Sequence, residues 1–288
     1  MKLLNKMKLK DKRILVTGGS MGIGAKIAAF CVSEGASVII TARHQKDLEN
    51  TLASLKKIND TDHFFFTLDV SKKENVKKLA AEIQKKYSHL DGLVNCAGIY
   101  GPIGKTGEID IEKLEETINI NLLGTIFMCH YFLPLLQKSA RGKIVNLSGG
   151  GGSGPFPNYT AYATAKTGVV RLTENMSLEC ANENLDINAI APGFVITRLH
   201  DRTIEAGEKA GRAFFEKTKS EIEKGGVPPE KAAALAVFLL SGESNGITGK
   251  FISAPWDEWQ TPEFQTKLRQ DKDFCTLRRI DDQHFFKK

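Results

Sequence analysis

The 288-residue sequence has few features that would support a metal centre, a disulfide framework or export. Its five cysteines, Cys31, Cys96, Cys129, Cys180 and Cys275, form no Cys-x-x-Cys pair, so neither a zinc site nor disulfides are expected. The N-terminus is charged and has no apolar signal core, and we expect no later run to cross a bilayer. We therefore expect a cytoplasmic protein with no metal and no membrane partner.

Charge of one sign is also not concentrated anywhere in the chain. The net charge is +6, and the lysines are scattered rather than gathered into a stripe with interleaved aromatic residues. No low-complexity tract or solenoid repeat interrupts the sequence. This pattern argues against nucleic acid as the main partner and weakly favours small anionic ligands.

Short apolar, β-branched runs alternate with helix-length amphipathic segments. The expected strands cover residues 13–17, 38–41, 64–68, 92–95, 143–147 and 186–191. Repeated strand–helix–strand units with right-handed crossovers predict a Rossmann-type, doubly wound parallel sheet in a three-layer α/β/α single domain. Such a sheet binds its ligand at the carboxyl ends of the strands.

A glycine-rich turn, residues 17–24, follows the first strand and opens a helix expected at residues 25–34. Gly18 permits a tight turn, Gly22 lets the backbone approach a pyrophosphate, and Gly24 allows close helix packing. The turn predicts a dinucleotide site lined by Gly18, Ser20, Met21, Gly22, Ile23 and Gly24.

The end of the second strand indicates which nicotinamide cofactor is bound. An acidic residue there would bind the 2′-hydroxyl of the adenosine ribose and repel a 2′-phosphate. The sequence instead has Arg43, which could form a charge-assisted fork to that phosphate. NADP(H) is therefore favoured over NAD(H), although a solvated loop arginine is the alternative.

Tyr162 and Lys166 are four residues apart, so on a helix they project from the same face. A nearby ammonium favours the phenolate, which would lower the pKa of Tyr162 from its usual value of about 10. The pair predicts a tyrosine that serves as a general acid and base.

Six motifs occur in the order and spacing of one family, and the chain from about residue 10 to 253 resembles the classical short-chain dehydrogenases/reductases. The motifs are Thr-Gly-x-x-x-Gly-Ile-Gly at 17–24, Asp69-Val70, Asn95-Cys96-Ala97-Gly98, Asn121-Leu122-Leu123-Gly124, Tyr162-x-x-x-Lys166, and Pro192-Gly193 followed by Thr197.

The resemblance implies a role for each matching residue. Tyr162 would exchange a proton with the substrate oxygen, while Lys166 would hold the nicotinamide ribose and Asn121 would link Lys166 to solvent through its backbone and a water. Asn95 would brace the central strands beside the cofactor. The other implied cofactor contacts are Asp69 and Val70 at the adenine, Ala97 and Gly98 at the ribose, and Pro192, Gly193, Val195 and Thr197 at the carboxamide. The family also implies a homodimer or homotetramer.

The sequence departs from the family at the residue thirteen positions before the tyrosine. The family usually has a serine there to polarise the substrate carbonyl, whereas this chain has Gly149. A one-residue shift turns a strand side chain to the opposite face, but the glycine run that follows makes the loop adjustable. We expect Ser148 to supply the donor, with Ser153 or a backbone amide as alternatives.

A second departure is the end of the chain. The core domain is expected to span residues 1–255, with a substrate lid at about 198–227 and a C-terminal extension at 256–288. The extension mixes aromatic residues with Arg269, Arg278 and Arg279, so it could pack against its own domain or a neighbouring subunit, or reach over the cleft. A plain surface helix pair is the alternative to a mobile lid.

The resemblance implies an NADP(H)-dependent oxidoreductase that interconverts a secondary alcohol and a ketone. Acyl-carrier-protein thioesters, steroids and sugars all remain possible substrates. A nicotinamide-binding sensor or scaffold that has lost turnover at Gly149 is the runner-up. A nucleotide-sugar epimerase or dehydratase is disfavoured, because the chain has no large second substrate domain.

Overall fold

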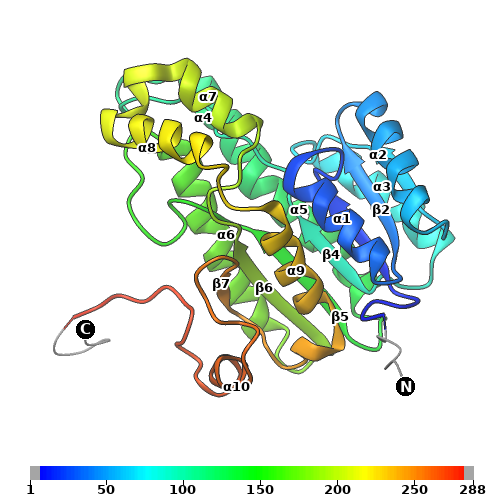
Figure 1. Cartoon of the computed structure of the whole chain (residues 1–288). Coiled ribbons are helices and arrows are strands. Elements are labelled where there is room, and N and C mark those ends of the chain that lie inside the picture. The colour runs from blue at the N-terminus through cyan, green and yellow to red at the C-terminus, as the bar shows by residue number, and fades with distance from the viewer. Residues whose placement is uncertain (1–6, 282–288) are drawn as a thin grey trace.

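The computed structural model describes residues 7–281, which form one parallel seven-stranded sheet in the order β3-β2-β1-β4-β5-β6-β7 (Figure 1). The strands are β1 (Arg13–Thr17), β2 (Ser37–Ala42), β3 (Phe64–Thr67), β4 (Gly92–Asn95), β5 (Gly142–Leu147), β6 (Leu185–Ala191) and β7 (Phe251–Ser253). The strand order reverses between β1 and β4, which creates the switch point where doubly wound folds bind ligands. The predicted fold class is confirmed, and β7 joins the six expected strands.

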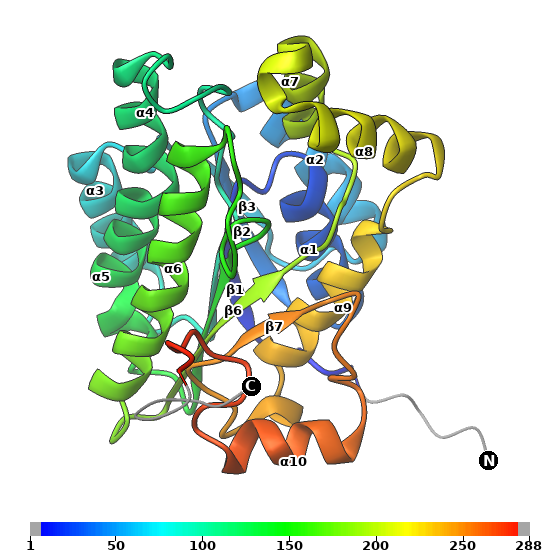
Figure 2. The ribbon, with the colours of Figure 1, turned by 90° about the vertical axis from the view of Figure 1, so that its left-hand side faces the viewer.

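Helices cover both faces of the sheet (Figure 2). One layer contains α3 (Lys73–Lys86), α4 (Ile111–Ile118), α5 (Gly124–Leu136) and α6 (Thr160–Glu179); the other contains α1 (Gly22–Ser33), α2 (Gln45–Ile58) and α9 (Pro229–Leu240). The central strands are buried on both sides, as their Val- and Ile-rich sequences require. Two apolar clusters, one on each face, form the core.

The predicted lid segment folds into two helices beyond the carboxyl ends of the strands (Figures 1 and 2). These are α7 (Arg198–Ala206) and α8 (Arg212–Glu223), joined by a short 3₁₀ turn, Gly207–Ala210. They lie at the edge of the sheet where doubly wound folds bind ligands. Whether they move remains a prediction.

One helical stretch is apolar enough to span a membrane by length and composition, contrary to the expectation from the sequence. It is the continuous helix Ile111–Leu136, which includes α4, α5 and the π-helical turn Asn119–Leu123 between them. Met128, Cys129 and Phe132 on this helix are fully or almost fully buried in the core. Its hydrophobicity therefore serves packing between the sheet and helices α3 and α6.

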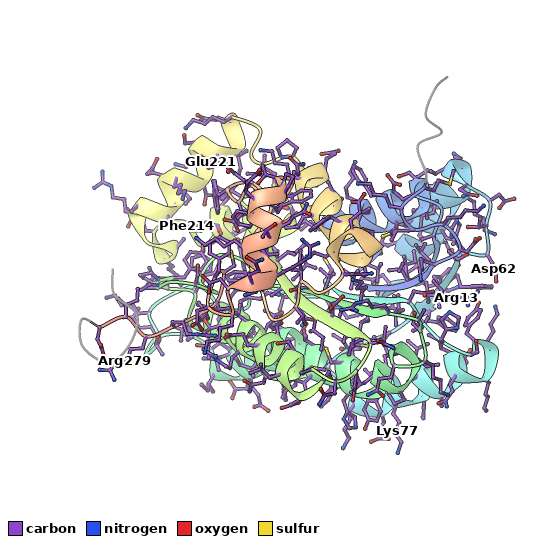
Figure 3. All side chains as sticks on the ribbon, turned by 90° about the horizontal axis from the view of Figure 1, so that it is seen from below. Arg13, Asp62, Lys77, Phe214, Glu221 and Arg279 are labelled. Atoms are coloured by element: carbon purple, nitrogen blue, oxygen red, sulfur yellow. The ribbon has the colours of Figure 1, made fainter. Side chains whose placement is uncertain are left out.

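The chain after β7 packs onto the same core as the sheet. Trp259 lies against Phe238 with ring centroids 5.4 Å apart, and Leu268 on α10 (Pro262–Gln270) is 1% exposed. Further on, Arg278 pairs with the buried Glu174 of α6, three turns from Tyr162. Arg279 lies farther out on the extended chain (Figure 3). Residues 254–278 thus pack on their own domain; the predicted extension beyond 281 lies outside the described residues.

Candidate active site

The glycine-rich turn has a backbone that only glycine accommodates at two critical positions. Gly18 has φ of +63°, and a Cβ on Gly24 would lie 2.2 Å from the carbonyl oxygen of Gly18. Helix α1 begins at Gly22, and its N-cap residue Met21 makes no side-chain capping bond. The first amides of α1 are therefore available to an anion at the switch point of the sheet.

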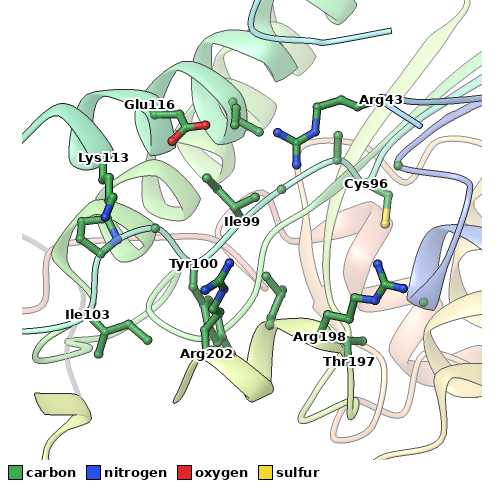
Figure 4. Close-up of a pocket in the computed structure, with 18 of the residues that line it drawn as sticks. Arg43, Cys96, Ile99, Tyr100, Ile103, Lys113, Glu116, Thr197, Arg198 and Arg202 are labelled. Atoms are coloured by element: carbon green, nitrogen blue, oxygen red, sulfur yellow. The ribbon is translucent and has the colours of Figure 1, made fainter. Parts of the chain in front are cut away.

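A large cleft of about 1610 Å³ runs from this turn to the lid helix α7 (Figure 4). Twelve predicted cofactor residues line it: Gly18, Ser20, Met21, Gly22, Ile23, Gly24, Arg43, Asp69, Val70, Ala97, Gly98 and Thr197. They come from the ends of β1, β2, β3, β4 and β6, so the parallel topology gathers five separate motifs into one site.

Arg43 follows β2 and its guanidinium extends into the cleft (Figure 4). It makes no hydrogen bond or ion pair to another described residue. Nearby, Asp69 accepts hydrogen bonds from the backbone amide and hydroxyl of Ser71 through one carboxylate oxygen, which leaves the other for a ligand. The exposed cation and the held carboxylate both line the cleft, and their contacts with an adenosine 2′-phosphate and an adenine amino group remain predictions.

Six predicted cofactor residues are not on the lining of the cleft: Tyr162 and Lys166, described below, and Asn95, Pro192, Gly193 and Val195. Asn95 donates a hydrogen bond of 2.9 Å to Asn146 Oδ1 and so braces β4 against β5. Pro192 and Val195 are buried, and a Cβ on Gly193 would lie 2.8 Å from Pro255. These residues shape the turn that carries Thr197, whose methyl group is 3.5 Å from the position of a Cβ on Gly22.

Tyr162 and Lys166 lie one turn apart on α6, as their spacing predicts, and both are buried. The ammonium of Lys166 is 5.8 Å from the centre of the Tyr162 ring. It donates a hydrogen bond of 2.7 Å to the carbonyl of Leu147. The Tyr162 hydroxyl makes no hydrogen bond to another described residue. A phenol and an amine are therefore held side by side, with the phenol free to bind a ligand.

The pKa of Tyr162 is not lowered by Lys166, contrary to the expectation from the sequence. Burial raises the pKa of the Tyr162 phenol, and the charge on Cys96 would raise it further. Burial also lowers the pKa of Lys166 to about 8. Desolvation penalises both charged forms here, so the Tyr162 phenol is neutral at neutral pH, and Lys166 loses its charge as the pH rises through about 8. Cys96 itself has a pKa raised by burial to about 11, which fits a packing residue.

Asn121 lies in the π-helical turn between α4 and α5, a distortion often found at functional sites. Its side chain donates to the Ile99 carbonyl and accepts from the Ile99 amide, at 2.8 and 2.9 Å. A Cβ on Gly98 would lie 3.2 Å from Asn121 Oδ1 and 3.5 Å from Lys166 Nζ. Asn121 and Lys166 thus enclose Gly98 from two sides, and the water link through the Asn121 backbone remains a prediction.

The structure does not bring Ser148 to Tyr162. The Ser148 hydroxyl is buried and donates a hydrogen bond of 3.0 Å to the carbonyl of Lys166. The next residue faces Tyr162 instead, because a Cβ on Gly149 would lie 2.8 Å from the Tyr162 hydroxyl. The expected shift in register does not occur, since adjacent residues at the end of β5 still face opposite sides. Ser153, the alternative, is exposed on the loop.

Sequence reasoning missed an aromatic cluster that joins Tyr162 to the lid. Tyr100 packs edge-on against Tyr162 with ring centroids 4.8 Å apart, and its hydroxyl lies 3.2 Å from His200 Nε2 on α7. Tyr159 bonds the Thr203 hydroxyl one turn further along the same helix, at 2.8 Å. The position of Tyr100, two residues after the Asn-Cys-Ala-Gly motif, could have marked it as a residue near the cleft, although not its contact with His200.

Comparisons with known proteins agree with this geometry. Residues 12–207 match the family model described as short chain dehydrogenase. The chain therefore belongs to the short-chain dehydrogenase family, and its relatives include proteins named as dehydrogenases and reductases, one of them as NAD-dependent.

Two relatives and one solved structure illustrate the range of the family. A 3beta-hydroxysteroid dehydrogenase of Mediterraneibacter gnavus is 32% identical over 85% of this chain and 93% of the relative. An NAD-dependent glycerol dehydrogenase of Listeria innocua is 31% identical over 84% and 91%. A short chain dehydrogenase of Escherichia coli, solved in complex with NADPH, superposes with a TM-score of 0.77 at 26% identity, over 87% of this chain and 99% of the other.

Proposed function

We propose that this protein is an NADP(H)-dependent oxidoreductase that interconverts a secondary alcohol and a ketone. The observation that carries the proposal is the buried Tyr162–Lys166 pair, which lies against Tyr100 and Gly98 on the lining of a cleft that begins at the glycine-rich turn. The residues fit the cofactor: helix-start amides for the pyrophosphate, Arg43 for the 2′-phosphate and Asp69 for the adenine.

The chain would divide the chemistry between a proton donor and a cation. When bound, the nicotinamide supplies or accepts the hydride. Tyr162 gives its proton to the substrate oxygen in reduction and takes it back in oxidation. Lys166 binds the ribose hydroxyls and restores the proton to Tyr162, for which a pKa of about 8 is well suited.

Arg43 supports the choice of NADP(H) over NAD(H). The Arg43 guanidinium at the end of β2 pairs with no residue among those described, and it favours a phosphate over a hydroxyl because the hydrogen bonds to the phosphate are charge-assisted. One relative is named as NAD-dependent, and two similar solved structures are complexes with NADP or NADPH, so this preference rests on the chain's own residue.

A second function is favoured by one observation. Gly149 removes the usual carbonyl-polarising side chain, and Tyr162 is only 7% exposed beneath Tyr100, as would suit a nicotinamide-binding sensor or scaffold without turnover. The retained Tyr162, Lys166 and Asn121 favour the enzyme, since a binding protein would not need the three together.

The proposal includes a small carbonyl or alcohol substrate that enters between the loop of residues 100–105 and α7, both of which line the cleft. We also propose a cytoplasmic homodimer or homotetramer assembled through α5 and α6. Light scattering at micromolar concentration tests the assembly, and a monomer would contradict it.

The proposed function is tested by titrating purified protein with NADPH and NADH, followed by nicotinamide absorbance assays on a panel of ketones and secondary alcohols. The enzyme predicts tighter NADPH binding and consumption of NADPH with at least one ketone. Binding without turnover of any member of the panel would favour the sensor or scaffold.

A further inference from the structure

The site lacks the side-chain donor that would polarise a carbonyl beside Tyr162. Gly149 faces the Tyr162 hydroxyl without a side chain, and the Ser148 proton is directed to the Lys166 carbonyl. An oxygen gaining negative charge in the transition state needs such a donor, and loss of one costs on the order of 10² to 10³ in rate. The inference that follows rests on the proposed function.

Tyr100 is the side chain best placed to fill this gap. It lies in the loop that follows β4, lines the cleft and meets the Tyr162 ring at an interplanar angle of 88° (Figure 4). Its exposed fraction is 6%, so a hydrogen bond from its hydroxyl would form in a largely dry environment, where it is strong.

His200 determines which way the Tyr100 hydroxyl can donate. His200 Nδ1 accepts from the backbone amide of Thr197 at 3.4 Å, which places the imidazole proton on Nε2 when the ring is neutral. Burial keeps it neutral by lowering its pKa to about 4. His200 Nε2 therefore donates to the Tyr100 oxygen at 3.2 Å.

The proton of Tyr100 is consequently left without an acceptor in the described chain. Its oxygen accepts from His200, and no other described residue bonds the hydroxyl. A buried donor with no acceptor is costly to maintain and commonly marks a ligand site.

We propose that Tyr100 donates a hydrogen bond to the same substrate oxygen that Tyr162 protonates, with His200 as the positioning residue. Because His200 and Thr197 lie at the start of α7, the donor is oriented only while this helix is docked. Docking of the lid would thus complete the catalytic site as well as cover it.

The test compares Tyr100→Phe with Tyr159→Phe, using the ketone that the wild type reduces fastest. Both changes remove one buried hydroxyl from the same aromatic cluster and one hydrogen bond to α7. Tyr159 does not line the cleft, so it controls for lid packing. We expect kcat to fall on the order of 10²-fold in Tyr100→Phe and less than about 3-fold in Tyr159→Phe, with NADPH affinity unchanged in both.

The role of His200 is tested by His200→Gln, whose amide can still donate to Tyr100, against His200→Leu, which cannot. Retention of more kcat by the Gln variant supports positioning, whereas equal losses contradict it. Equal kcat losses in Tyr100→Phe and Tyr159→Phe, or a faster Tyr100→Phe enzyme, would also overturn the proposal. If Tyr162→Phe is inactive and Tyr100→Phe is unaffected, the donor role fails and the proposed function stands; if the wild type reduces no ketone, both fail.

Discussion

Gly149 lies against Tyr162 so closely that a Cβ on Gly149 would be 2.8 Å from the tyrosine hydroxyl. Contacts under 3.0 Å force a shift, and the Tyr162 ring is buried among Tyr100 and Phe156, which limits where it can go. The glycine that replaces the usual serine is therefore a requirement of how this active-site tyrosine is packed.

Gly149→Ala should lower kcat about 10-fold or more, because displacing a reacting group by a fraction of an ångström is expensive. Gly150→Ala is the matched control, since its Cβ would have its nearest neighbour at 3.8 Å, on Phe156. NADPH affinity should stay within about 2-fold in both variants. Steady-state kinetics and cofactor titration check this, and a fully active Gly149→Ala enzyme would show that Tyr162 has room to move.

Arg43→Ala should weaken NADPH binding roughly 10- to 100-fold and leave NADH binding unchanged, because only the phosphate contact is lost. Lys46→Ala on α2 removes the same charge nearby without altering the cleft lining, and it should change NADPH affinity by less than about 2-fold. Dissociation constants of NADPH and NADH, measured for the wild type and both variants, test this prediction. Equal losses of NADPH affinity in the two variants would mean that Arg43 acts only through its general positive charge and not through contact with the phosphate.

Lys166→Met should raise the free energy of unfolding at pH 7, by on the order of 1–2 kcal/mol, while impairing turnover. The pKa of Lys166 is about 8 in the folded state against 10.5 for an unperturbed lysine, so the unfolded chain binds more protons between these values. The contribution of Lys166 to the free energy of unfolding of the wild type therefore rises as the pH increases from 8 to 10.5. At pH 7 the full cost of the buried charge is present, partly offset by the hydrogen bond to Leu147.

The advantage of Lys166→Met over the wild type should consequently shrink as pH rises from 8 toward 10.5, as denaturant unfolding at several pH values would show. Lys143→Met is the control, because Lys143 is equally buried but pairs with Asp186 at 2.7 Å. Removing it leaves a buried carboxylate with less compensation and should destabilise the protein. A Lys166→Met advantage that does not change with pH would contradict the depressed pKa.

Trp259→Ala should destabilise the protein by about 3–5 kcal/mol, because a large buried ring is removed from the main core cluster. Trp256→Ala, three residues earlier, should stay within about 0.5 kcal/mol since Trp256 is 75% exposed. Equilibrium unfolding of the two variants compares them directly. Equal effects would mean that the segment after β7 does not pack as described.

The sequence predicted the sheet, the cofactor turn and the Tyr162–Lys166 pair because each depends on local spacing. A period-two apolar run, a glycine at a fixed offset or a four-residue step on a helix determines geometry without reference to distant residues. Thus Arg43, Asp69 and Gly98 line one cleft as expected.

The errors concern long-range contacts. The direction of the Ser148 hydroxyl depends on the Lys166 carbonyl, and the pKa of Tyr162 depends on total burial rather than on its nearest cation. The Tyr100–His200 contact joins residues a hundred positions apart, so no local pattern could reveal it. For the extension after residue 255, the sequence left open packing on its own domain, on a neighbouring subunit or over the cleft, and the buried Trp259 shows packing on its own domain.

The central claim is hydride transfer from the nicotinamide to a carbonyl carbon with Tyr162 as the proton donor. It is tested most directly by running wild type and Tyr162→Phe with NADPH deuterated at the transferable position and analysing the product by mass spectrometry. The account predicts one deuterium on the carbinol carbon with the wild type, and unchanged NADPH binding but no labelled alcohol with Tyr162→Phe. Labelled product at a similar rate from both proteins, or product without deuterium from the wild type, would contradict it.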